Sequence, residues 1–104
     1  MLIILSGLPG VGKTTIAREL ARRIGAVHLR IDSIEQALRR AGHQVEADGY
    51  EIAYAVAEDN LRAGRTVIAD CVNPWSLTRE AWRAVAERAG TSALDVEIVC
   101  SDAA

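Results

Sequence analysis

A short apolar run followed at once by a glycine-spaced turn is the feature that most constrains how this chain folds. Residues 2–5 read LIIL, and behind them Gly7, Gly12, Lys13 and Thr14 follow the spacing G-x-x-x-x-G-K-[ST]. The apolar run is typical of a fully buried strand, and the lysine opens a helical pattern. The order of strand, glycine-rich turn and helix therefore predicts a βα unit at the start of the chain.

The pattern behind the turn predicts a helix from residue 13 to Gly25. Ile16, Leu20 and Ile24 recur every four residues, as apolar residues do on the packed face of an amphipathic helix. Gly25 is a typical helix stop.

Apolar runs and helical patterns alternate along the rest of the chain. In order, we expect a strand at 27–31, a helix at 33–41, a loop at 42–49, a helix at 50–63, a strand at 65–70, a helix opened by 73–75 and closed by Gly90, and a last strand at 93–100. Such alternation predicts an α/β fold with a mainly parallel sheet and helices on both faces. In the last strand apolar residues alternate with Asp95 and Glu97, which indicates a strand at the edge of the sheet.

Length and composition limit the classes of protein that remain. The 104 residues suit one domain, 1–104, and half are hydrophobic while a quarter are charged, as in an ordinary globular protein. The formal charge of −2, with scattered arginines, disfavours a nucleic-acid partner. The run at 2–5 is too short for a membrane span and lacks the basic flank of a signal peptide, so we expect a cytoplasmic protein with no membrane partner. Cys71 and Cys100 do not make a disulfide framework and are expected to be core or strand-end thiols.

The glycine-spaced segment has the chemistry of a phosphate-binding loop. Glycines let the backbone turn tightly and aim its N–H groups inward, and the helix start adds a partial positive charge. Lys13 would place a mobile charge on the β- and γ-phosphates, and the Thr14 hydroxyl would join the shell of a Mg²⁺ ion. The residues expected to bind the nucleotide are Gly7, Gly10, Val11, Gly12, Lys13, Thr14 and Thr15. A glycine turn with an incidental lysine is the alternative, but Lys13 is the only lysine among 12 basic residues.

Three stretches carry a resemblance to a known family: GLPGVGKTTIAREL at 7–20, Asp32 after the second strand, and VIADCVNPWSLTREAW at 67–82. The chain resembles the P-loop nucleoside triphosphate proteins, most of all small kinase-like ATP-binding proteins related to polynucleotide kinase, zeta toxin and chloramphenicol phosphotransferase. The resemblance implies a sheet with its strands in the order second, third, first, fourth. That order separates Cys71 from Cys100 by two strand spacings, about 10 Å, whereas a disulfide needs Cα atoms within about 7 Å. GTP-binding members read guanine with an Asn-Lys-x-Asp element, which this chain lacks because its lysine is in the loop, so ATP is the expected nucleotide.

Two aspartates at strand ends are candidates for the reaction chemistry. In the resembled family, the aspartate at the position of Asp70 approaches the Mg²⁺ shell directly or through water; a solvated strand-end carboxylate is the alternative. The aspartate at the position of Asp32 faces the acceptor hydroxyl and orients it or accepts its proton. Residues 32–35 read DSIE, so the equal alternative is that Asp32 caps the next helix with Glu35 in a capping box. Several relatives carry arginine at the position of Glu35, so the acceptor need not be an anion held there.

The remaining candidates each have a structural alternative. Asn73 and Arg79 match the third stretch of the resemblance, but Asn73 also suits a cap for the helix opened by Pro74, and Arg79 suits a solvated helix face. Trp75 lies in the same stretch, near the expected substrate site, and is a candidate for stacking on a substrate ring. A packed core position is the alternative. No Cys/His spacing indicates zinc. Nothing beyond packing or surface positions is indicated for Trp82, His28 and His43.

The sequence therefore predicts an ATP-dependent phosphotransferase that moves the γ-phosphoryl group to a hydroxyl of a small molecule, with Mg²⁺ as cofactor. Lys13 and Asp32 would be its catalytic residues, and Thr14 and Asp70 would hold the metal. The rival hypothesis is a nucleotide-binding module in which ATP switches contacts with a partner and hydrolysis is slow. The resemblance covers all of this chain but only the first part of such a kinase, which continues into an arginine-bearing lid and a fifth strand. We accordingly expect an N-terminal portion of a longer kinase that is a poor catalyst alone and self-associates through the edge of its last strand.

Overall fold

The computed structural model describes residues 1–7, 12–45, 47–71 and 76–98, in which helices and strands follow one another as βα units. Its elements are β1 (Leu2–Ser6), α1 (Lys13–Ile24), β2 (Val27–Arg30), α2 (Ile31–Arg40), α3 (Asp48–Arg62), β3 (Val67–Asp70), α4 (Ser76–Ala89) and β4 (Ala93–Glu97). Most of these bounds agree with the expected ones to within two residues.

The strands form one parallel sheet in the order β2-β3-β1-β4. β1 is paired on both sides, with Leu2 beside Val67 of β3 and Ile3 beside Leu94 of β4. The expected α/β class and strand order are therefore confirmed. Because the strands are parallel, their carboxyl ends and the residues that follow them meet at one end of the sheet.

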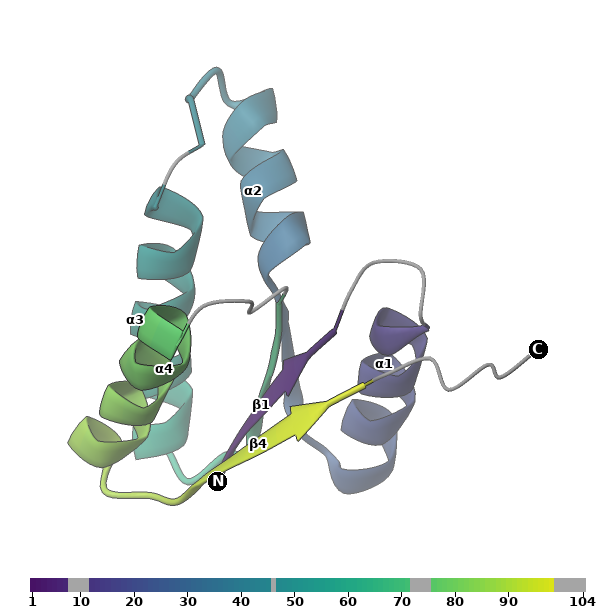
Figure 1. The fold of residues 1–104 in the computed structure, drawn as a ribbon, viewed down its shortest axis with the longest axis vertical. Coiled ribbons are helices and arrows are strands. Elements are labelled where there is room, and N and C mark those ends of the chain that lie inside the picture. The colour runs from purple at the N-terminus through teal and green to yellow at the C-terminus, as the bar shows by residue number, and fades with distance from the viewer. Residues whose placement is uncertain (8–11, 46, 72–75, 99–104) are drawn as a thin grey trace.

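Helices cover the two faces of this sheet unequally: α2, α3 and α4 lie on one face and α1 lies on the other (Figure 1). Under the three helices the core contains Leu2, Ile4, Val67 and Ala69 of the strands with Ala53, Ala57, Trp82 and Val85 of the helices. Under α1 it contains Ile3, Leu5 and Ile68 with Ala17 and Ala21. Alternate strand residues thus enter opposite cores, so the side chains of each strand divide between a large core and a small one.

The face of α1 that packs on the sheet differs from the expected one. Lys13, Ala17 and Ala21 are buried, whereas Ile16 and Ile24 are 44% and 49% exposed. The four-residue period was correct, but its phase is one residue off. Residues 13, 17 and 21 share a helix face, so turning Lys13 inward turns the two alanines inward as well.

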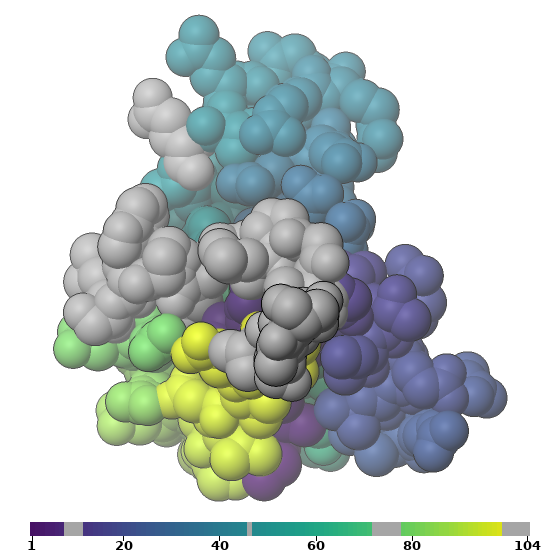
Figure 2. Space-filling model, turned by 45° about the vertical axis from the view of Figure 1, so that its right-hand side comes forward, coloured from purple at the N-terminus to yellow at the C-terminus, as the bar shows by residue number. Residues whose placement is uncertain are grey.

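Strand β4 lies at the edge of the sheet, as expected, but it is more open than its pattern indicated. Leu94 is 48% exposed, although its register with Ile3 places it on the face that α1 covers. Figure 2 shows β4, in yellow, at the surface of the molecule. In the described part of the chain β4 pairs with β1 alone. Self-association through this edge stays a prediction.

Trp82 is a core residue, which is one of the two positions that the sequence indicated for it. Its side chain is fully buried, and its ring meets Tyr54 of α3 edge-on with ring centroids 4.7 Å apart. His43 is exposed between α2 and α3. Across the described ranges, no helix has the length and apolar character needed to cross a membrane.

Candidate functional site

Two glycines shape the turn between β1 and α1. Gly7 has φ 154°, and a Cβ added to it would lie 2.7 Å from the carbonyl oxygen of Ile98. Any larger residue at this position would therefore clash with that oxygen. The Ile98 N–H donates to the Ser6 carbonyl at 2.8 Å and so holds the end of β4 against this turn. Gly12 has φ 82° and precedes α1 without a side-chain cap. The first N–H groups of α1, which include those of Lys13 and Thr14, therefore have no acceptor within the helix and suit an anion.

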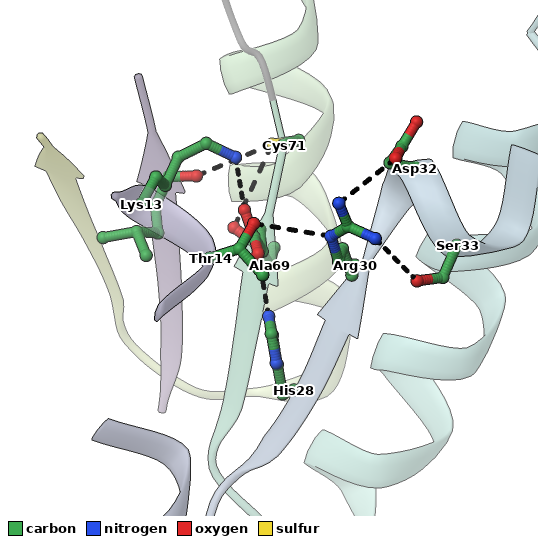
Figure 3. Close-up of polar contacts among 10 residues, drawn as sticks. Lys13, Thr14, His28, Arg30, Asp32, Ser33, Ala69 and Cys71 are labelled. Carbon is green, nitrogen blue, oxygen red and sulfur yellow. Dashed lines mark hydrogen bonds and ion pairs between the residues drawn. The ribbon is translucent and has the colours of Figure 1, made fainter. Parts of the chain in front are cut away.

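Lys13 points from the first turn of α1 to Asp70 at the end of β3. The Lys13 ammonium and the Oδ1 of Asp70 form a close ion pair, and both side chains are buried. His28 of β2 approaches the other oxygen of the same carboxylate, with 2.8 Å between Nε2 and Oδ2 (Figure 3). Each oxygen of Asp70 thus has a partner, one from the loop lysine and one from the neighbouring strand.

These two partners determine the ionisation of Asp70. Burial alone would raise the pKa of its carboxyl group, but the hydrogen bonds with His28 and Lys13 and the positive charge of the Lys13 ammonium outweigh it. The pKa of Asp70 therefore falls from its ordinary 3.8 to about 2. The carboxylate is charged at neutral pH, as a group that pairs with a cation must be.

Acidification should remove the stability that this ionisation provides. Because folding lowers the pKa of Asp70 from 3.8 to about 2, the folded state gains on the order of 2 kcal/mol above about pH 4 and loses it as the pH falls towards 2. We expect urea unfolding in EDTA to show this loss between pH 6 and pH 2.5. The Asp70→Asn variant should lose less over the same interval. Equal losses in the two proteins would mean that Asp70 is not the titrating group.

Arg30, the last residue of β2, connects the phosphate loop to the start of α2. Its Nε donates to Thr14 Oγ1 at 3.4 Å, its Nη1 donates to Ser33 Oγ at 3.3 Å, and its Nη2 lies 3.2 Å from Asp32 Oδ2 (Figure 3). The predicted metal-binding residue Thr14 and the predicted acceptor-facing residue Asp32 are therefore joined through one guanidinium group. Sequence reasoning did not single out Arg30, and it gave His28 no role beyond packing or a surface position, which the contact of His28 with Asp70 corrects. Their spacing of two along a strand that ends beside Asp70 was the available signal.

Asp32 is not a helix cap. Helix α2 begins at Ile31, so Arg30 occupies the N-cap position, with no side-chain cap, and Asp32 lies inside the first turn. Its carboxylate accepts a hydrogen bond from Gln36 at 3.1 Å, and its side chain is 51% exposed. A capping box with Glu35 is likewise absent from this start of α2; the Cγ of Glu35 packs so close to Gly49 of α3 that a Cβ there would lie 2.8 Å from it. The capping interpretation is wrong, and the acceptor-facing role stays a prediction.

Cys71 follows Asp70 and confirms the expectation of a core thiol. It is buried and unpaired, and burial, opposed by the charge of Lys13 and by the nearby indole of Trp82, raises the pKa of its thiol to about 11. A thiol with this pKa is protonated at neutral pH and is a poor nucleophile. We assign it no part in the chemistry.

Among the described residues, Arg79 is not brought into this arrangement. Arg79 lies in α4 and is partly buried, with no hydrogen bond or ion pair to any residue in the described ranges. Five others lie outside the described residues, which leaves their predicted contacts as predictions: Gly10, Val11, Asn73, Trp75 and Cys100.

Thr14 and Asp70 have the donor chemistry that magnesium needs at a nucleotide site. Magnesium in such sites takes one or two carboxylates and completes its shell with water and phosphate oxygens. The described residues contain no group of three or more His, Cys, Asp and Glu side chains that could hold a metal by itself. The residues present therefore fit a magnesium ion that is bound together with a nucleotide.

The parallel sheet, the glycine turn after β1 and the lysine at the start of α1 define a P-loop nucleotide-binding domain. Over residues 2–104 the sequence matches the AAA domain family, and the chain belongs to that family. Membership implies that the chain binds ATP.

Curated relatives in this comparison are longer than this chain. A protein of Pyrococcus furiosus, provisionally named an adenylate kinase, is 38% identical over 73 residues, which are 67% of this chain and 39% of the relative. A protein of Pyrococcus abyssi with the same provisional name is 44% identical over 62 residues, which are 57% and 34% of the two chains. The matched region spans about two fifths or less of the length of these relatives.

Two of the solved structures with the same fold are described as kinases. A protein of Chloroflexus aurantiacus, provisionally described as a kinase, superposes with a TM-score of 0.83 at 22% identity and covers 94% of this chain and 58% of its own. The APS kinase of Mycobacterium tuberculosis gives a TM-score of 0.64 at 21% identity over 93% of this chain and 73% of its own. At these identities the likeness shows the fold alone.

Proposed function

We propose that this chain is the nucleotide-binding part of an ATP-dependent phosphotransferase that transfers the γ-phosphoryl group to a hydroxyl of a small molecule. The observation that carries the proposal is the junction of the loop with two strand ends. There Lys13 contacts Asp70, and Thr14 is linked to Asp32 through Arg30. A purely structural turn would not need a buried lysine, a buried aspartate and a half-exposed aspartate at one end of a parallel sheet.

Binding of ATP would exchange the partners of Lys13. The backbone N–H groups at the start of α1 would take the phosphates, and Lys13 would leave Asp70 for the β- and γ-phosphate oxygens. His28 would keep its hold on Oδ2 of Asp70 and so leave Oδ1 free for the metal shell. Magnesium held by Thr14 and Asp70 would supply neutralisation of the phosphate charge.

Transfer would then need a base on the acceptor side, and we assign that role to Asp32. The acceptor oxygen forms the new bond to the γ-phosphorus, the bond from that phosphorus to the β–γ bridging oxygen breaks, and ADP leaves with the electron pair. The acceptor proton passes to the Asp32 carboxylate. With a side chain 51% exposed, Asp32 is open to an acceptor while Gln36 and Arg30 hold its orientation.

The names of the similar proteins support a small acceptor. They are those of kinases for adenylate, for APS and, in Sinorhizobium meliloti, for gluconate, the last with a TM-score of 0.62 at 18% identity over 91% of this chain and 55% of its own. The acceptors in these names differ, so they support the class of reaction rather than one substrate. A screen of hydroxyl compounds for acceptor-dependent ADP formation would identify the acceptor. ATP binding without transfer to any of them would favour the rival nucleotide-binding module.

Binding of Mg-ATP should raise the melting temperature of this chain. At a hundredfold excess over Kd the linkage contribution is about 2.7 kcal/mol, and each kcal/mol moves Tm by roughly 4–8 °C in a domain of this size. We therefore expect a rise of roughly 10–20 °C, measured by differential scanning fluorimetry, that becomes smaller when EDTA removes the metal. Thr14→Val should reduce the rise, and Thr78→Val, a matched change on α4, should not. No change in the wild-type Tm with Mg-ATP would refute the proposed function.

A further inference from the structure

Arg30 carries a positive charge at the boundary between the phosphate loop and the region assigned to the acceptor. Among the described residues, each nitrogen of its guanidinium group has one partner: Thr14 on the loop side, and Ser33 and Asp32 on the α2 side (Figure 3). A guanidinium group has five N–H donors, so these contacts leave two of them for another ligand. The side chain is 36% exposed and therefore accessible.

The other arginines with assigned partners are held away from the loop. Arg22 and Arg23 pair with Glu19, Arg62 and Arg88 pair with Glu58, and Arg83 pairs with Asp95. Across the described ranges, Arg30 is the one arginine that donates a hydrogen bond to a loop residue. Together with Lys13 it brings two positive charges to the amino end of α1.

The present partners of Arg30 are weaker than a phosphate would be. Asp32 offers one oxygen with a single, half-exposed negative charge, and Thr14 and Ser33 offer neutral hydroxyls. A terminal phosphate offers several charged oxygens, and the planar fork of arginine can take two of them at once. Arg30 can therefore gain a stronger ligand without moving far from its present position beside Thr14.

We propose that Arg30 binds the terminal phosphate of the nucleoside triphosphate, with Asp32 and Ser33 holding its guanidinium group on the acceptor side. This inference rests on the proposed function. A positive charge in that position stabilises the negative charge on the oxygens of the transferring phosphoryl group. Strand β2 then supplies both a residue that orients Asp70, His28, and a residue that contacts the phosphate, Arg30.

Selective loss of affinity for the terminal phosphate is the test. We would measure Kd by isothermal titration calorimetry for Mg-ADP, for the magnesium salt of the β,γ-imido analogue of ATP, and for Mg-ADP with aluminium fluoride. Arg30→Gln should weaken the last two roughly ten- to hundredfold and change the affinity for Mg-ADP by less than about threefold. Arg30→Lys keeps the charge without the fork and should lie between Arg30→Gln and the wild type.

Arg23→Gln is the matched control, because it removes the same charge from the far end of α1, where Arg23 pairs with Glu19. It should leave all three affinities unchanged. Equal weakening of Mg-ADP and the ATP analogue by Arg30→Gln would show that Arg30 only braces the loop, and no weakening would show no phosphate contact; either result overturns the inference. If the wild type binds none of the three ligands, the proposed function fails as well, and the two failures are distinguishable.

Discussion

Replacing Lys13 with alanine is expected to destabilise the nucleotide-free chain by about 3–5 kcal/mol, because it removes one partner of a buried ion pair. Asp70 is 1% exposed and, among the described residues, would keep His28 alone as a partner. Urea unfolding without nucleotide measures this loss directly. The effect is large compared with the roughly 5–15 kcal/mol that stabilises a typical domain. Loss of ATP binding by Lys13→Ala must therefore be separated from partial unfolding.

An exposed ion pair of the same chain provides the control. Arg83 of α4 pairs with Asp95 of β4, but Arg83 is mostly exposed, so Arg83→Ala should cost less than about 1 kcal/mol. The double variant Lys13→Met with Asp70→Leu replaces both charges of the pair by apolar groups and should recover part of the loss, because His28 then loses its carboxylate partner. A cost below 1 kcal/mol for Lys13→Ala would contradict the buried ion pair.

Local sequence patterns were sufficient to predict the elements and their order. The apolar run of β1, the glycines on either side of α1 and the alternation of later segments are all set by neighbouring residues. The rotation of α1 was not predictable in this way. Apolar periodicity favoured Ile16, whereas the contact of Lys13 with Asp70, 57 residues away, turns Ala17 and Ala21 towards the sheet. A long-range polar contact thus outweighs the apolar pattern of the helix.

The sequence predicted those parts of the candidate site that a single continuous segment forms, and not the contacts between distant segments. The loop and the strand-end aspartates could be recognised from their local context. The contacts of His28 with Asp70 and of Arg30 with Thr14 depend on the pairing of β2 with β3, which places Arg30 beside Asp70 in register. The resemblance implied that β2 adjoins β3, but it did not give the register that places Arg30 beside Asp70. Local context also misled at Asp32, whose capping motif is formally present although α2 begins at Ile31, two residues before the expected start.

The second large effect is expected at Asp32, where asparagine should leave the fold intact and remove the base. Asparagine keeps an oxygen that can accept the hydrogen bonds from Gln36 and Arg30, and Asp32 does not cap α2, so the free energy of unfolding should change by less than about 0.5 kcal/mol. The amide cannot accept the proton of an acceptor hydroxyl at neutral pH. General-base catalysis contributes about 10²–10⁴ in rate, so transfer to an acceptor found by the screen should fall by that factor.

The measurements for Asp32→Asn are chosen so that a structural effect cannot imitate a catalytic one. Single-turnover transfer with saturating Mg-ATP reports the chemical step, and calorimetry with the imido analogue reports nucleotide binding, which should stay within about threefold of the wild type. Asp59→Asn, the same change at an exposed position of α3 away from the loop, should alter neither. Transfer that continues at the wild-type rate in Asp32→Asn would exclude proton acceptance by Asp32. Its carboxylate would then act only as a partner of Arg30, a role that asparagine retains without the charge.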